Sequence, residues 1–214
     1  MALQNRVTPL GDVIVHSARG TFMGNRGILH GADQRLGQAR WRHPHWVTCV
    51  LAYKDWHREV MQPNNYTELF FLDEATALAA GHRPCALCRR RDYDAFQEAL
   101  SDALHRDDSL GANALDRMLH TARIAEGTRR QKRFEAVLDN VPSGAMIRFP
   151  GDPEQAWLVQ NDHLLRWQPE GYDAFDKRPM GKLVDVLTPR PSVLALQRGY
   201  QPFLHPSAES LLVA

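Results

Sequence analysis

Two of the chain's three cysteines, Cys85 and Cys88, lie in the sequence GHRPCALCRRR at residues 81–91. A Cys-x2-Cys turn directs two thiolates at one ion, and zinc is the usual occupant when further cysteine or histidine ligands come from elsewhere in the chain. The pair therefore predicts a Zn²⁺ site of which it supplies half. The candidates for the remaining ligands are Cys49, His45, His57 and His82.

Three other uses of this turn stay open. A thioredoxin-type redox pair lies at the end of a strand in a β-α-β unit, whereas a helix is expected before this turn. A nucleophilic cysteine is a second alternative, because a helix start and the arginines at 89–91 lower a thiol pKa; Cys85 and Cys49 are the candidates. A third is a metal-free pair of thiols that packs against the following helix.

Arginine dominates the charge near the N-terminus. Residues 1–50 contain six arginines, no lysine and two acidic residues, although the whole chain carries a net charge of only +1. The planar guanidinium holds oxyanions in a fixed orientation, so this excess predicts contacts with phosphate. The candidates there and beside the cysteine turn are Arg19, Arg26, Arg42, Arg83, Arg89, Arg90 and Arg91.

The composition is that of a water-soluble chain with enough apolar residues, 43%, for a substantial core. No apolar run approaches the length of a membrane span, and the start MALQNRVTPLGD lacks the profile of a signal peptide. Three cysteines without a secretory signal predict reduced thiols rather than disulfides. We therefore expect a cytoplasmic protein with no membrane partner.

The elements around the cysteine turn follow from short patterns. Residues 46–53 alternate as a strand that places Cys49 with Val47 and Leu51 on the expected core face, and further strands are expected at 56–61 and 66–72. Asp73 then caps a short alanine-rich helix that Gly81 ends. A second helix is expected to open at Cys88.

The remainder predicts helices followed by a sheet. Apolar spacing from about residue 90 to residue 140 predicts helices divided at Gly111 and Gly127, with the basic run 129–133 on a solvated face. Strands are then expected at residues 146–149, 156–160, 164–167 and 183–187, followed by one helix from Thr188 to Gly199. The prediction is an α+β protein with segments 1–100, 101–140 and 141–214, the first containing the zinc-type module and the last a small antiparallel β domain with one helix.

The sequence FFLDEATALAAGHRPCALC at residues 70–88 resembles the zinc-binding N-terminal module of Ada-type methylphosphotriester DNA-repair proteins. In that family a short helix ends in glycine, and Arg-Pro-Cys-x2-Cys follows with both cysteines ligating zinc. The resemblance implies that Cys85 and Cys88 bind metal and that the surrounding surface faces DNA phosphates. The family's upstream Cys-x3-Cys pair, which includes the methyl-accepting thiolate, is replaced by His45-x3-Cys49, whereas His57 lies nearer the family's spacing. The remainder of the chain resembles uncharacterised bacterial proteins, which implies no activity.

These observations predict a zinc-containing protein that binds nucleic acid, with DNA favoured as the partner and repair or damage response as the setting. One alternative is an enzyme, metal-dependent or with a cysteine nucleophile, that acts on a nucleic-acid or phosphate-bearing substrate. Another is a metal-free interaction protein. Metal content and salt-dependent binding to oligonucleotides separate the three.

Overall fold

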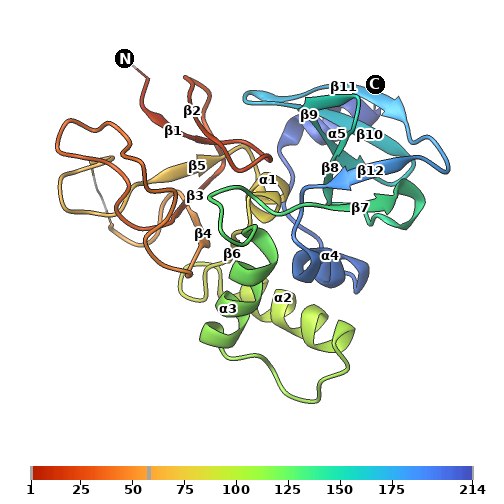
Figure 1. Cartoon of the computed structure of the whole chain (residues 1–214), viewed down its shortest axis with the longest axis horizontal. Helices are drawn as coiled ribbons and strands as arrows, with labels where there is room; N and C mark the ends of the chain where they lie inside the picture. The colour runs from red at the N-terminus through yellow and green to blue at the C-terminus, as the bar shows by residue number, and fades with distance from the viewer. Residues whose placement is uncertain (1, 57–58, 214) are drawn as a thin grey trace.

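The structure is a computed structural model that describes residues 2–56 and 59–213. Its described part contains two six-stranded sheets and five α-helices, which confirms the predicted α+β class. Figure 1 shows the N-terminal sheet, in red to yellow, and the C-terminal sheet, in green to blue, on either side of helix α1. The predicted ligand His57 lies outside the described residues.

The N-terminal sheet is mixed and has the strand order β2-β1-β5-β3-β4-β6. Its strands are β1 (Gln4–Val7), β2 (Val13–Val15), β3 (Phe22–Asn25), β4 (Val47–Val50), β5 (Leu69–Phe71) and β6 (Arg83–Pro84). The strands predicted at 46–53 and 66–72 are present in shorter form as β4 and β5, whereas the described residues of 56–61 form no strand. Left-handed backbone at Lys54 and Met61 interrupts the extended chain there.

The face of strand β4 that meets the core is the opposite of the one predicted. Trp46 and Thr48 are 3% and 1% exposed, whereas Cys49 is only half-buried and lines a pocket. Side chains alternate between the two faces of a strand, so the burial of Trp46 and Thr48 turns Cys49 away from the core. The expectation that Cys49 shares the core face was therefore wrong.

Helix α1 (Glu74–Ala79) agrees with the sequence prediction to within a residue. The side chain of Asp73 accepts a hydrogen bond from the Thr76 N–H at 2.9 Å, which satisfies a donor at the helix start. The alanines are explained by packing on both sides, because Ala77 belongs to the core of the N-terminal sheet and Ala75 to a core of the C-terminal sheet. Small side chains let the helix fit between the two sheets.

Helices α2 (Arg90–Ala103) and α3 (Ala112–Arg123) follow, with α2 starting two residues later than predicted. The helix predicted after Gly127 is absent. Instead Phe134–Val137 forms strand β7, followed by one 3-10 turn at Leu138–Asn140. Strand β7 pairs with β12 (Leu183–Val186) at the edge of the second sheet. The apolar spacing of residues 134–137 suits a helix or a strand, and the hydrogen bonds to β12 favour the strand.

The C-terminal sheet is antiparallel throughout, in the order β11-β10-β9-β8-β12-β7. Its other strands are β8 (Met146–Phe149), β9 (Asp152–Gln160), β10 (His163–Gln168) and β11 (Gly171–Lys177). The predicted strands are all present, and Asn161, at φ 52°, makes the expected hairpin turn. Strand β11 was not predicted, and two helices follow rather than one: α4 (Arg190–Gln197) and α5 (Pro206–Val213).

The three predicted segments pack against one another. One hydrophobic core contains Leu78 and Phe96 from residues 1–100, Leu119 from residues 101–140, and Ile147 and Val186 from the C-terminal sheet. The Glu74 carboxylate strengthens this connection by accepting a hydrogen bond from the Phe203 N–H at 2.9 Å. Division of the chain at residues 100 and 140 into separate folding units stays a prediction.

Candidate metal centre and its pocket

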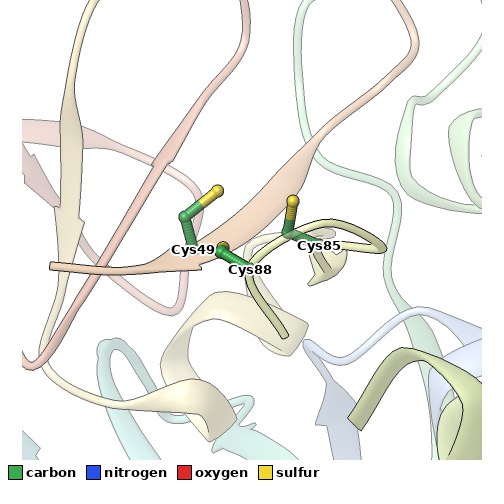
Figure 2. A group of neighbouring side chains, drawn as sticks. All are labelled: Cys49, Cys85 and Cys88. Atoms are coloured by element: carbon green, nitrogen blue, oxygen red, sulfur yellow. The ribbon is translucent and has the colours of Figure 1, made fainter. Parts of the chain in front are cut away.

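The three cysteines meet at one point of the N-terminal sheet (Figure 2). Strand β4 supplies Cys49, and the turn between β6 and α2 supplies Cys85 and Cys88, so that the three Sγ atoms lie within 4.8 Å of one another. The Cys85 N–H donates to the Thr48 carbonyl at 2.9 Å, which fixes the turn beside the strand. Three sulfur atoms this close can hold one metal ion.

Backbone donors and neighbouring thiols favour negative charge at this point. The Leu87 N–H donates to Cys85 Sγ at 3.4 Å. Hydrogen bonds from the thiols of Cys49 and Cys88 hold the pKa of Cys85 far below its usual range, while the contact with Cys85 raises the pKa of Cys49. One thiol therefore loses its proton readily. Its negative charge disfavours ionisation of the other two thiols unless a bound cation compensates the charge.

All three cysteines line a pocket of about 780 Å³. Aromatic side chains form part of its wall, among them Tyr53 and Phe70. The cysteines are half-buried rather than enclosed. A metal held by them would therefore face a space large enough for a small molecule or part of a polymer.

Glu68 adds a buried acid to this pocket. The side chain is 3% exposed, and its Oε2 accepts a hydrogen bond from the Met61 N–H at 2.7 Å. The Oε1 atom has no hydrogen-bond partner among the described residues. A buried carboxylate oxygen without a hydrogen-bond donor destabilises the folded protein, and such an atom is typical of a site that takes a proton or a polar ligand. Nothing in the local sequence around residue 68 indicated it.

Two arginines stand at the same pocket without an acidic partner within ion-pair distance in the described chain. Arg19, one of the predicted phosphate contacts, is exposed, whereas Arg6 is half-buried with its guanidinium 4.9 Å from the centre of the Phe70 ring. Burial and then the charge of Arg19 lower the pKa of Arg6. The two cations therefore lie close enough to repel each other, and an anion between them would relieve that repulsion.

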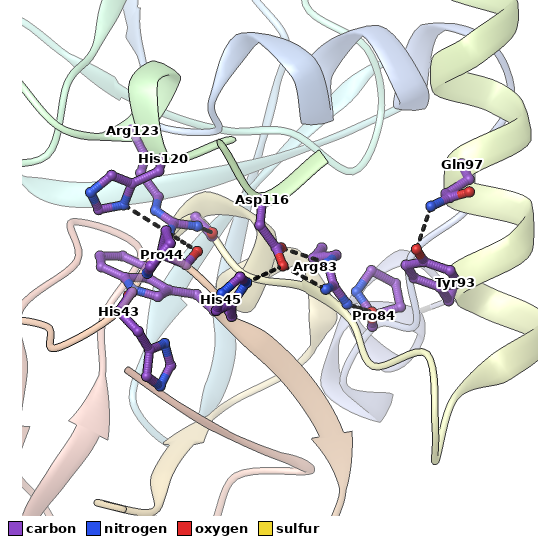
Figure 3. A network of polar contacts seen from close by, with 12 residues as sticks. His43, Pro44, His45, Arg83, Pro84, Tyr93, Gln97, Asp116, His120 and Arg123 are labelled. Carbon is purple, nitrogen blue, oxygen red and sulfur yellow. Dashed lines mark hydrogen bonds and ion pairs between the residues drawn. The ribbon is translucent and has the colours of Figure 1, made fainter. Parts of the chain in front are cut away.

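The other predicted histidine ligands are not brought to the cysteines. His45 Nδ1 lies 2.7 Å from Asp116 Oδ2 (Figure 3), outside the cysteine group. His82 is fully buried between aromatic rings, with its ring centre 5.2 Å from that of Trp46 and 4.6 Å from that of Phe71. Neither ring nitrogen of His82 has a hydrogen-bond partner in the described chain. Burial, with the nearby arginines, lowers its pKa well below the usual value.

Several predicted phosphate contacts are instead occupied inside the protein. Arg83 is 4% exposed and donates to both carboxylate oxygens of Asp116 at 2.8 and 2.9 Å (Figure 3). Arg89 is equally buried and forms an ion pair with Glu74 at 2.7 Å. These partners, 33 and 15 residues away, could not be recognised from the local sequence.

The remaining predicted arginines lie in three different settings. Arg90 is exposed and pairs with Asp94 at 2.8 Å on the surface of α2, and Arg91 is exposed beside it. Arg42 is exposed and donates to the Ile28 carbonyl at 3.3 Å. Arg26 is 3% exposed and lines a different pocket from that of the cysteines.

Comparison with known proteins adds no relative. No family model matches the sequence, and neither the curated proteins nor the solved structures give a match. Within the described ranges, no helix combines the length and the apolar character needed to cross a membrane. The resemblance to the Ada-type module therefore stays a hypothesis, and a functional proposal must rest on the geometry of the site.

Proposed function

We propose that the protein binds one zinc ion through Cys49, Cys85 and Cys88 and holds nucleic acid, with DNA favoured, against the same pocket. The observation that carries the proposal is the convergence of all three cysteines from two separate parts of the chain. Thiolate ligands favour zinc among the common divalent ions, and a cytoplasmic setting keeps such thiols reduced.

A fourth ligand completes the tetrahedron. His57, predicted from its spacing, lies outside the described residues, and the alternative is a water molecule or a ligand entering from the pocket. A His57→Ala variant distinguishes these arrangements: loss of zinc supports the histidine, whereas full zinc content supports an open position. His163→Ala, in strand β10 of the other sheet, is the matched control.

The nucleic-acid part of the proposal rests on the composition of the pocket. Arginines bind phosphate, and aromatic rings stack on bases regardless of their identity. Arg6, Arg19 and the exposed ring of Trp56 bring both properties to the cysteines. A strand of nucleic acid held in this way would place its backbone beside the metal, as the Ada-type resemblance implies.

Binding of a labelled DNA strand over a salt series tests this part. Arg19→Gln is expected to weaken binding at low salt and to reduce the slope of log K against log salt by about one unit, because one phosphate contact is lost. Arg117→Gln, an exposed position on α3 that does not line the pocket, is the control. Equal effects of the two variants would indicate nonspecific attraction and remove this part of the proposal.

An enzyme is the second candidate, favoured by the buried Glu68 oxygen in the same pocket. A zinc ion with an open position activates a bound water molecule, and a nearby carboxylate can take its proton. Cys85, whose pKa lies far below its usual range, is the candidate nucleophile if no metal is bound. If Glu68→Gln abolishes turnover of a phosphate-bearing substrate and the variant keeps its zinc, the enzyme is favoured.

A further inference from the structure

A second pocket, of about 700 Å³, lies away from the cysteines and shares no lining residue with their pocket. Its wall comes from the N-terminal sheet, the end of α1, the chain after α3 and the end of the C-terminal sheet where β8 turns into β9. Seven arginines and two acidic residues, Asp12 and Glu154, line it. We therefore call it the arginine pocket.

Two of its arginines are buried at positions where no carboxylate neutralises them. Arg26 and Arg123 are 3% and 0% exposed, and their guanidinium carbons lie 4.2 and 3.7 Å from the ring centre of Trp46. Their terminal nitrogens donate to backbone carbonyls, including Ala80 for Arg26 and Gly81 for Arg123. In both side chains the Nε atom has no partner among the described residues.

The acids nearest to these two arginines do not neutralise them. Asp12 is exposed and is not within ion-pair distance of Arg26, while Asp116, close to Arg123, is occupied by Arg83. Burial lowers the pKa of Arg26 to about 9 and that of Arg123 well below its usual value. Buried cations without a counter-charge are costly, and a bound anion would compensate them.

Further arginines extend the positive charge toward the mouth of the pocket. Arg133 is half-buried with an unpartnered Nε, and Arg148 pairs with Asp185 at 2.8 Å. Arg40, Arg129 and Arg130 are exposed, and none of them forms an ion pair in the described ranges. The guanidinium groups thus outnumber the carboxylates from the floor to the rim.

We propose that the arginine pocket binds a small ligand carrying two or more phosphate groups. A cavity of this volume suits a small molecule, whereas a macromolecular partner usually docks on a flatter surface. Several guanidinium groups around one cavity match the many oxygen atoms of a polyphosphate. This assignment does not rest on the zinc site, because the two pockets use different residues. Trp46 is already covered by guanidinium groups, so recognition is directed at phosphate rather than at a stacked base.

Calorimetric titration with pyrophosphate, and separately with ATP, tests the proposal. One site per chain is expected. The double variant Arg40→Gln with Arg130→Gln should weaken binding at least about tenfold, because charge-assisted contacts are lost. Both side chains are exposed and make no side-chain hydrogen bond or ion pair within the described chain, so the fold should be unaffected. Thermal unfolding with pyrophosphate gives a second readout, since a ligand of the folded state raises Tm.

Two controls separate this site from the zinc centre and from general charge. Arg117→Gln removes the same charge outside the pocket and should leave affinity unchanged, and zinc-free Cys49→Ser protein should still bind pyrophosphate. Absence of saturable binding at millimolar pyrophosphate and ATP would overturn the proposal, as would equal weakening by Arg117→Gln. Binding of a DNA strand alone at this pocket would also overturn it, because the ligand would then be a polymer backbone.

Discussion

Trp46 and Cys49 lie three residues apart in the chain, yet they line different pockets. Trp46 precedes strand β4 and is buried against Arg26 and Arg123, whereas Cys49 points from the strand to the other two cysteines. Successive side chains of an extended chain point to opposite faces of a sheet, so two residues three positions apart lie on opposite faces. One short strand thus supplies the wall of a positively charged pocket and a ligand of the candidate metal centre.

Loss of metal should lower the stability of the protein. Chelation is expected to reduce the free energy of unfolding by about 3 kcal/mol if free zinc is present at roughly 100 times its Kd, because the ion binds only the assembled site. Cys88→Ser should have a Tm close to that of the chelated protein and should no longer respond to the chelator. Denaturant unfolding with and without chelator measures both. A variant that still loses stability on chelation would place the metal elsewhere.

His82 should make the fold sensitive to acid. Its folded-state pKa is lowered, so below about pH 6.5 the unfolded chain binds a proton that the folded chain does not, and stability falls as pH falls. The loss from this group approaches about 1.4 kcal/mol per pH unit. His82→Phe removes it, so the variant should lose less stability than the unchanged protein between pH 7 and pH 5.

The measurement for His82 is denaturant unfolding at several pH values. For each protein, the free energy of unfolding at neutral pH is subtracted from the values at lower pH, which removes the effect of the different packing of histidine and phenylalanine. Parallel pH curves for the two proteins would contradict the account. Unchanged zinc content of His82→Phe is also expected, because this ring packs against Trp46 and Phe71 rather than beside the cysteines.

Asp116 should be far more important for stability than a surface acid. Asp116→Ala leaves the buried Arg83 guanidinium without its carboxylate, and the expected loss is about 3–5 kcal/mol. Asp94→Ala, which breaks the exposed pair with Arg90, should leave stability unchanged within error. Urea unfolding of the two variants provides the comparison. Similar, small losses in both would show that the Arg83 charge is compensated in another way.

Gly81 is required by the backbone that leads into the cysteine turn. Its φ is +84°, and an added Cβ would lie 2.5 Å from Cδ of Arg123. Gly81→Ala should therefore destabilise the protein by more than the roughly 1 kcal/mol of backbone strain alone. Gly151→Ala is the matched control, since its Cβ would meet no atom within 4 Å. Thermal unfolding of both compares them, and equal Tm values would contradict this reading.

Local signals in the sequence predicted local structure well. Asp73 and Gly81 marked the ends of α1, and Asn161 marked the hairpin between β9 and β10, because capping and turn chemistry depends on neighbouring residues. The segment 134–140 was wrongly predicted to be helical. Its apolar spacing suits helix or strand, and pairing with β12 from about fifty residues away decided the outcome.

The candidate site was predictable only in its residue types. The Cys-x2-Cys turn and Cys49 were named from the sequence, but the face on which Cys49 lies depended on which side of β4 the core covers. Likewise, no local pattern shows that Arg83 and Arg89 meet buried carboxylates. No local pattern predicts the arginine pocket, because its side chains come from segments far apart in the chain.

X-ray absorption spectroscopy at the zinc edge, on purified protein with a measured metal content, shows whether the three cysteines hold one zinc ion. We expect one zinc ion per chain with three sulfur neighbours at about 2.3 Å and one nitrogen or oxygen neighbour at about 2.0–2.1 Å. Cys49→Ser should remove a sulfur from the spectrum or the ion from the protein. Protein that takes up no zinc under reducing conditions, or a bound ion with fewer than three sulfur neighbours, would contradict it.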